Sequence, residues 1–243
     1  MDKHRLFITA TSTGVGKTLV SGLLLNFLRG QGINAGYQKW VATGGSETVE
    51  DLERVVALAG GGREEELDLQ VVYRLGLAAS PHLAAERAGL EIAPEPIIAA
   101  YEKLAKRYEV LLVEGAGGLL VPLSRRLLLA DLVARLQMPA LLVARSGLGT
   151  LNHTLLSLEA LRSRNIPLLG VLLTDDPDED ETIAADNLRT IAEIGRARVF
   201  GRLPRCGNDG ELFAAFRPLG EAILAALAPG RAPLAKSLPF GVR

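Results

Sequence analysis

The chain has 243 residues, of which 48% are hydrophobic, enough to bury the core of one α/β domain. Its 27 Lys and Arg residues balance 28 Asp and Glu residues, so no overall basic field favours nucleic acid or an anionic membrane. The one cysteine, Cys206, excludes an intramolecular disulfide framework and an all-cysteine metal site. The sequence also lacks an apolar run of the roughly 18 residues that a membrane span needs. We therefore expect a cytoplasmic protein without a membrane or nucleic-acid partner.

Short apolar runs alternate with stretches of helical periodicity along most of the chain. Strands are expected over residues 6–9, 33–37, 110–114, 140–144, 168–173 and 198–200. Helices are expected over residues 17–29, 97–107, 151–164, 180–194 and near 211–227. This alternation predicts a mostly parallel sheet with helices on both faces, in a single domain over residues 1–228. Residues 229–243, which contain several Pro and Gly residues, are expected to form an irregular tail.

A run of small residues, "ATSTGVGKT" at 10–18, joins the first expected strand to the first expected helix. Lys17 and Thr18 begin that helix, where free backbone N–H groups and the helix dipole attract an anion such as phosphate. The lysine would contact the outer phosphates, the hydroxyl would bind Mg²⁺, and Gly14 and Gly16 would let the backbone come close. Thr11 stands where the strict phosphate-loop (P-loop) pattern has glycine, so an ordinary glycine-containing turn is the alternative. The flanking strand and helix favour a P-loop, and with it an α/β fold of the P-loop NTPase type.

An acidic residue ends the buried strand in "LLVEGAGGLLVPL", residues 111–123. Ligands of open α/β sheets bind at the carboxyl ends of the strands, so Glu114 is a candidate Mg²⁺ ligand. A glutamate turned towards solvent is the alternative. The glycine-rich run that follows indicates that a large group approaches this backbone.

Two further stretches indicate what the protein could do with a bound phosphate group. In "GYQKWVATGG", residues 36–45, Lys39 is expected just past the second strand, with Thr43 in a glycine-bounded loop. A second lysine beside a phosphoryl group would stabilise transition-state charge, although a surface lysine is the alternative. A small-residue loop opens another helix near Thr150, whose N-terminus could hold a substrate carboxylate or could simply be capped.

Taken together, these motifs resemble the dethiobiotin synthetase family. The family patterns G-T-D-T-x-V-G-K-T, K-P-V-x-[ST]-G, V-E-G-A-G-G-x-x-V-P and L-G-T-[IL]-N-H-T-L-L correspond, in order, to "ATSTGVGKT", "KWVATG", "VEGAGGLLVP" and "LGTLNHTLL". The stretches "VEDLERVVALAG" and "SPHLAAERAGLEI" are also similar, so the resemblance spans most of residues 5–205. It implies a homodimer with its site at the subunit interface.

The resemblance also implies roles for individual residues. It assigns catalysis to Lys39 and Lys17, and metal binding to Thr18, Asp51 and Glu114. It assigns substrate binding to Thr13, Thr43, Gly149, Thr150 and Asn152. It assigns nucleotide binding to Gly14, Val15, Gly16, Lys17, Thr18, Leu19, Asp51, Glu114, Gly115, Ala116, Gly117, Thr174, Asp175, Pro204, Arg205 and Cys206.

The reaction that the resemblance implies is an ATP- and Mg²⁺-dependent ring closure that forms C–N bonds. One amine of 7,8-diaminononanoate takes up CO₂ to give a carbamate, whose oxygen attacks the γ-phosphorus of ATP. The second amine then attacks the carbamic-phosphoric anhydride, phosphate leaves and dethiobiotin forms. Positioning and charge stabilisation are then the main work of the protein.

The sequence departs from the family pattern at several positions. Ala10 replaces a glycine, Ser12 an aspartate and Trp40 a proline. Thr174-Asp175 stands where the family often has an asparagine that contacts adenine. Asp175 could accept a hydrogen bond from an exocyclic amine, which predicts a relaxed or altered base preference.

Two other functions remain open from the sequence. One is a nucleotide-switched binding protein of the partitioning-ATPase type, which usually carries an extra lysine early in the P-loop, where this chain has Thr11 and Ser12. The other is a synthetase homologue that binds nucleotide without turnover, an alternative that the departures from the family pattern leave open.

Overall fold

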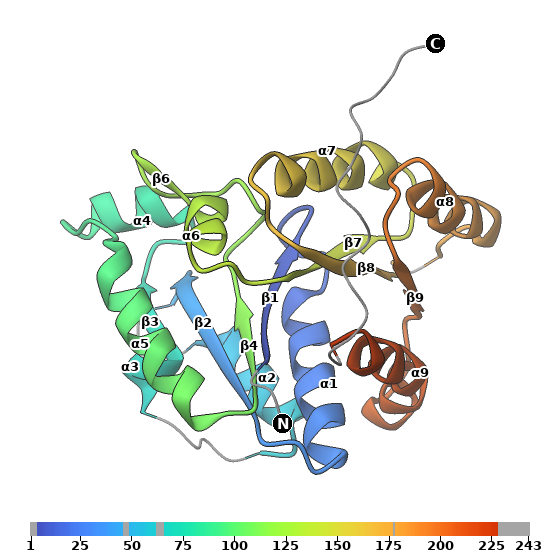
Figure 1. Ribbon diagram of the computed structural model, residues 1–243, viewed down its shortest axis with the longest axis horizontal. Coiled ribbons are helices and arrows are strands. Elements are labelled where there is room, and N and C mark those ends of the chain that lie inside the picture. Colours follow the sequence, from blue (N-terminus) through green and yellow to red (C-terminus); the bar gives the residue numbers. More distant parts are fainter. Residues whose placement is uncertain (1–3, 46–48, 62–65, 177, 228–243) are drawn as a thin grey trace.

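The computed structural model describes residues 4–45, 49–61, 66–176 and 178–227. A seven-stranded, wholly parallel sheet in the order β3-β2-β4-β1-β7-β8-β9 forms its centre (Figure 1). The strands are β1 (His4–Ala10), β2 (Ala35–Thr43), β3 (Val71–Leu75), β4 (Val110–Glu114), β7 (Ala140–Arg145), β8 (Leu168–Thr174) and β9 (Val199–Leu203). A separate antiparallel pair consists of β5 (Pro122–Ser124) and β6 (Leu127–Leu128).

Helices cover both faces of the sheet, as the sequence predicts. They are α1 (Lys17–Gly30), α2 (Glu50–Leu58), α3 (Leu67–Gln70), α4 (Pro81–Arg87), α5 (Pro94–Arg107), α6 (Leu129–Arg135), α7 (Thr150–Ser163), α8 (Glu181–Glu193) and α9 (Asp209–Leu227). One face packs against α1, α2 and α9. The other packs against α4 to α8, and Figure 1 shows α5 and α1 on opposite sides of β2 and β4.

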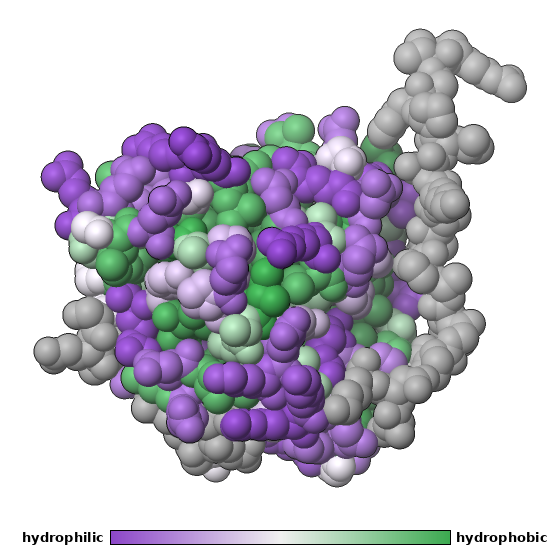
Figure 2. All heavy atoms as spheres, turned by 60° about the vertical axis from the view of Figure 1, so that its left-hand side comes forward, coloured by the Kyte–Doolittle hydropathy of each residue, from purple (hydrophilic) through white to green (hydrophobic). Residues whose placement is uncertain are grey.

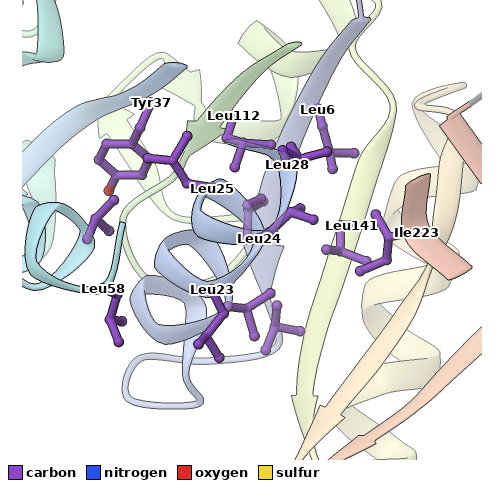
Figure 3. Close-up of a cluster of buried hydrophobic side chains, with 14 of the residues drawn as sticks. Leu6, Leu23, Leu24, Leu25, Leu28, Tyr37, Leu58, Leu112, Leu141 and Ile223 are labelled. Atoms are coloured by element: carbon purple, nitrogen blue, oxygen red, sulfur yellow. The ribbon is translucent and has the colours of Figure 1, made fainter. Parts of the chain in front are cut away.

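The leucine-rich side of α1 forms the centre of the first layer. Leu24 and Leu28 of α1 pack with Leu6 of β1 and Leu112 of β4, all of them buried (Figure 3). Burial of such side chains stabilises the fold by about 1.5–3 kcal/mol each relative to exposure. The packing fixes α1 against the strands whose carboxyl ends carry the candidate site residues.

The second strand is longer than the sequence indicates. Instead of ending near residue 37, β2 continues to Thr43, and Trp40 and Val41 are buried within it. The prediction that Lys39 lies past the strand is therefore wrong, because this stretch alternates between two buried faces rather than one buried and one exposed face. Trp40 packs on the Phe7 side, with ring centroids 5.1 Å apart, which leaves Lys39 on the α1 side.

Several short elements were not predicted from the sequence, including β3, α2, α4 and α6, whose hydrophobic periods are too brief to stand out. Residues 229–243, predicted to be an irregular tail, lie outside the described residues. Within the described part of the chain, no helix has the length and apolar character needed to cross a bilayer. Figure 2 shows hydrophilic residues interspersed with smaller hydrophobic areas on one face of the molecule.

Candidate functional site

The P-loop lies between β1 and α1. Gly14 and Gly16 have φ values of +74° and +97°, in the left-handed region that favours glycine. A Cβ atom on Gly16 would also lie 3.1 Å from Cγ2 of Thr174. No described side chain caps α1, so its first backbone N–H groups are left for a ligand. This geometry suits a phosphate group at the helix N-terminus.

Two side chains from neighbouring strands hold the carbonyl groups of this loop. Thr174 Oγ1, at the end of β8, donates to the Val15 carbonyl over 2.8 Å. Arg145 Nη2, at the end of β7, donates to the Gly14 carbonyl over 2.9 Å, and Arg145 also pairs with Asp176. Sequence reasoning missed Arg145 because it lies just before the motif that begins α7 and does not belong to it.

Glu114 is completely buried at the end of β4, and its carboxylate accepts four contacts. On one side, Oε1 lies 2.8 Å from Lys39 Nζ and 3.1 Å from Thr18 Oγ1. On the other side, Oε2 accepts hydrogen bonds from Ser21 Oγ over 2.7 Å and from the Tyr37 hydroxyl over 3.1 Å. Burial, followed by the charges of Glu114 and Asp51, raises the pKa of Tyr37 well above its usual 10.0, so Tyr37 remains a donor.

Asp51, at the start of α2, joins the same cluster. Lys39 Nζ lies 2.6 Å from its Oδ2 atom, and Thr18 Oγ1 lies 2.9 Å from its Oδ1 atom. The single hydroxyl proton of Thr18 can serve either Asp51 or Glu114 at one time. The structure thus brings Thr18, Lys39, Asp51 and Glu114 together.

These contacts set the charges of the cluster. Burial lowers the pKa of Lys39, but the carboxylates of Glu114 and Asp51 outweigh it, so the pKa is raised overall. Burial alone would raise the pKa of Asp51, yet Lys39 lowers it below its usual 3.8. Burial lowers the pKa of Lys17, with Glu114 opposing the shift. Lys17 Nζ lies 3.4 Å from the Ser12 carbonyl, folded over the loop.

The donor set suits a hard cation. Thr18 supplies a hydroxyl oxygen, and Asp51 and Glu114 supply carboxylate oxygens, the ligand types that Mg²⁺ prefers. The ammonium of Lys39 lies between the two carboxylates and offsets part of their charge. The residues therefore fit a divalent metal beside the P-loop.

The glycine-rich loop after β4 packs directly on the P-loop. A Cβ atom on Gly118 would lie 3.4 Å from the carbonyl oxygens of Ala10 and Thr11, and one on Gly117 would lie 3.6 Å from Thr13 Oγ1. Gly115 is instead required by packing, because its Cβ atom would meet Leu129 and Phe7 at 2.6 and 2.8 Å. The sequence predicts that a large group approaches this backbone. In the structure, other parts of the protein, including the P-loop, come close to these glycines.

Of the candidate substrate residues, Thr13 lies in the P-loop, and the others lie at the end of β2 and at the start of α7. Thr43 ends β2, and Gly149, with φ of +91°, precedes α7, which Thr150 begins. Asn152 is exposed on that helix. Asn187 of α8 fixes the start of the loop by donating to the carbonyls of Ser146 and Gly147 over 2.7 and 3.1 Å. Sequence reasoning missed Asn187, whose only signal is a polar residue on the buried side of a helix.

The candidate base-binding residues meet at the ends of β8 and β9. Both carboxylate oxygens of Asp175 accept hydrogen bonds from Arg202, over 3.0 and 2.8 Å, and hydrogen bonds to Asp175 raise the pKa of Arg202. The Asp175 backbone also bonds to Leu203, the residue before Pro204, Arg205 and Cys206. Thr174 is turned to the P-loop, so its contact with a base remains a prediction.

Comparison with known proteins shows which sequences and folds the chain resembles. A family model described as an AAA domain matches residues 4–208. The ATP-dependent dethiobiotin synthetases BioD of Brucella ovis and Rhodopseudomonas palustris are each 45% identical to the chain, over 82% of it and 85% of their own length.

Solved structures with lower identity share the fold. The MinC:MinD cell division protein complex of Aquifex aeolicus matches with a TM-score of 0.58 at 16% identity, covering 96% of this chain and 99% of that one. The McdA–ATP complex of Cyanothece matches with a TM-score of 0.59 at 14% identity, covering 95% and 98%. These likenesses show the P-loop NTPase-like fold alone. The identity of 45% over most of the chain goes further, and the chain belongs to the dethiobiotin synthetase family.

Proposed function

We propose that this chain uses ATP, Mg²⁺ and CO₂ to close the ureido ring of dethiobiotin on 7,8-diaminononanoate, releasing ADP and phosphate. The observation that carries the proposal is the cluster of Thr18, Lys39, Asp51 and Glu114 directly beside a glycine-based P-loop. The described residues thus offer phosphate-binding amides, a hard-cation donor set and two lysines on one side of the sheet. The cytoplasm is the proposed compartment.

The reaction requires three bond-forming steps. An amine nitrogen of the diamine attacks CO₂ and loses a proton, which gives a carbamate. A carbamate oxygen attacks the γ-phosphorus, and ADP leaves. The second amine attacks the carbonyl carbon of the anhydride and loses a proton, and phosphate leaves as the five-membered ring closes. None of these steps needs a covalent bond to the protein.

The protein then acts through position and charge. Lys17 and the amides of the P-loop hold the ATP phosphates, and the ammonium of Lys39 offsets charge on the transferred phosphoryl oxygens. Thr18, Asp51 and Glu114 would hold Mg²⁺, which when bound neutralises phosphate charge. Because Glu114 keeps Lys39 charged and fixed, the lysine contributes an oriented positive charge at little reorganisation cost.

The remaining assignments follow the chain's resemblance to its family. We propose that Thr13, Thr43, Gly149, Thr150 and Asn152 bind the diamine, and that a homodimer completes the site. Leu148, 91% exposed in the loop before α7, and Leu156, 56% exposed on α7, support an interface there, since covering them would remove apolar surface from water.

The test is phosphate release from the purified protein with MgATP and bicarbonate, with and without the diamine, and detection of the product by mass. Diamine-dependent release that yields dethiobiotin is expected. Lys39→Met should abolish most of the turnover, whereas Lys103→Met, on the exposed side of α5, should leave it unchanged. Thermal unfolding of both variants separates lost catalysis from lost folding. If ATP binds and the diamine changes nothing, the proposal is wrong.

A further inference from the structure

The two oxygens of the buried Glu114 carboxylate have different partners. Oε1 contacts Thr18 and Lys39, the residues of the proposed phosphate and metal site. Oε2 contacts Ser21 and Tyr37, neither of which belongs to a phosphate-binding or metal-binding motif. The carboxylate is therefore divided between a side that faces the site and a side that faces the protein interior.

The same two elements supply both pairs of partners. Helix α1 carries Thr18 and, three residues later on the same side of the helix, Ser21. Strand β2 carries Tyr37 and, two residues later on the same face, Lys39. Lys39 is the register partner of Glu114, and Tyr37 is the register partner of Leu112. Each element thus contributes one contact to each oxygen, and the carboxylate has no freedom to rotate without losing a bond.

Burial makes these bonds irreplaceable. Glu114 and Ser21 are 0% exposed and Tyr37 is 2% exposed, so water cannot substitute for a lost hydroxyl. The ring of Tyr37 belongs to a cluster of buried hydrophobic side chains and lies near Leu25 (Figure 3). Packing therefore holds the ring in place independently of its hydroxyl, and a phenylalanine would occupy the same space.

We propose that Tyr37 and Ser21 are positioning residues that hold Oε2 of Glu114 and so reserve Oε1 for the metal. This inference rests on the proposed role of Glu114 as a Mg²⁺ ligand. Groups that orient a metal ligand from behind typically change metal affinity 10–100-fold when they are removed. Loss of either hydroxyl lets the carboxylate turn, so that Oε1 no longer points reliably towards the site.

The test is titration of ADP into the protein by calorimetry, with Mg²⁺ and with a chelator in its place. The readout is the affinity for ADP with Mg²⁺ divided by the affinity for ADP with the chelator. A purely structural defect would not change this ratio. For Tyr37→Phe we expect this ratio to fall about tenfold, with ADP affinity in the chelator unchanged. Ser21→Ala should act in the same direction, and the double variant should lose at least as much as either single variant.

A matched control is available on the neighbouring strand. Tyr73 of β3 donates its hydroxyl to the Ala93 carbonyl and accepts from the Ala93 N–H, away from the cluster, so Tyr73→Phe removes tyrosine hydroxyl bonds elsewhere and should leave the ratio unchanged. Thermal unfolding is measured for every variant. If Tyr37→Phe and Ser21→Ala lose stability but keep the wild-type ratio, the inference is wrong while the metal site stands. If ADP binding to the wild-type protein does not depend on Mg²⁺, the proposed metal site is wrong and the inference falls with it.

Discussion

Lys39 and Glu114 are register partners on adjacent parallel strands, and their side chains form an ion pair with Nζ and Oε1 2.8 Å apart. Both side chains are almost completely shielded from solvent, with exposures of 4% and 0%. A pair buried to this degree is essential to the charge balance of the interior, whatever it contributes to catalysis.

Removal of Lys39 is therefore expected to destabilise the fold as well as the reaction. Lys39→Met leaves the buried Glu114 carboxylate without its positive partner, which should cost about 3 kcal/mol of unfolding free energy. The double variant Lys39→Met with Glu114→Gln should recover part of that loss, because the completely buried residue 114 no longer carries a charge, while the half-exposed Asp51 still lacks its lysine partner. Urea unfolding of the wild type, of Lys39→Met, of Glu114→Gln and of the double variant measures the coupling between the two residues. Additive losses of unfolding free energy would contradict it.

The stabilising effect of Asp51 should depend on pH in the acid range. Lys39 holds the pKa of Asp51 below its usual 3.8, so the folded state binds the proton less readily than the unfolded state. Stability from this carboxylate is then fully present above pH 3.8 and is lost as the pH falls through the lower folded pKa. Unfolding of wild type and Asp51→Asn, followed from pH 6 downwards, should show a difference that shrinks below about pH 4.

The matched variant for that comparison is Asp209→Asn. Asp209 also lies in the first turn of a helix, but its ion pair with Arg54 is exposed on both sides, at 57% and 48%. Its replacement should change the unfolding free energy by less than about 1 kcal/mol. A difference between wild type and Asp51→Asn that is constant with pH would contradict the assignment.

Thr174 is expected to act on nucleotide binding through the P-loop. Thr174→Val keeps the shape of the side chain and removes the donor to the Val15 carbonyl, a bond of 2.8 Å. Loss of about 1 kcal/mol should weaken ATP binding about fivefold. Thr174→Ser, which keeps the hydroxyl, should bind nearly as well as the wild type. If Thr174 instead contacts the base, the valine variant will weaken ATP and inosine triphosphate to different degrees.

The preference of the protein for one nucleotide base over another should depend on Asp175. Each of its oxygens accepts one bond from Arg202 and retains a lone pair that can accept another from an exocyclic amine. We therefore expect ATP to raise the melting temperature more than inosine triphosphate, which lacks that amine, and Asp175→Ala to remove the difference. Equal stabilisation of the wild type by both nucleotides would contradict this prediction.

The sequence predicts helices and strands well where the spacing of hydrophobic residues and the length of the segment indicate the same type of element. Residues 110–114 form a strand with the predicted limits, and α1 begins at Lys17 as expected. The second strand is predicted over residues 33–37, but its continuation to Thr43 is not, because both of its faces are buried, so Lys39 looks like a loop residue. Lys17, Thr18 and Glu114 could be found from motifs, Lys39 from its place in "GYQKWVATGG", and Asp51 from the family resemblance.

The supporting residues could not be found in the same way. Ser21 and Tyr37 matter because α1 and β2 meet on one face of the sheet, and that meeting depends on long-range packing. Arg145 and Arg202 lie at the carboxyl ends of β7 and β9 and Asn187 lies within α8, and none of the three belongs to a recognised motif. Arg145 and Asn187 bond to backbone carbonyls, which every residue has, and Arg202 bonds to carboxylates that only the fold brings beside it.

The ion pair of Lys39 with Glu114 also depends on the register between β2 and β4. A slip of one residue between β2 and β4 would move Lys39 to the opposite face of the sheet, where Trp40 packs in the native register. Lys39 would then lose its contacts with Asp51 and Glu114, and the hydrophobic packing on both faces of the sheet would be disrupted. A chain in which β2 pairs with β4 out of register therefore lacks the cluster of Lys39, Asp51 and Glu114, even if its strands are otherwise in order.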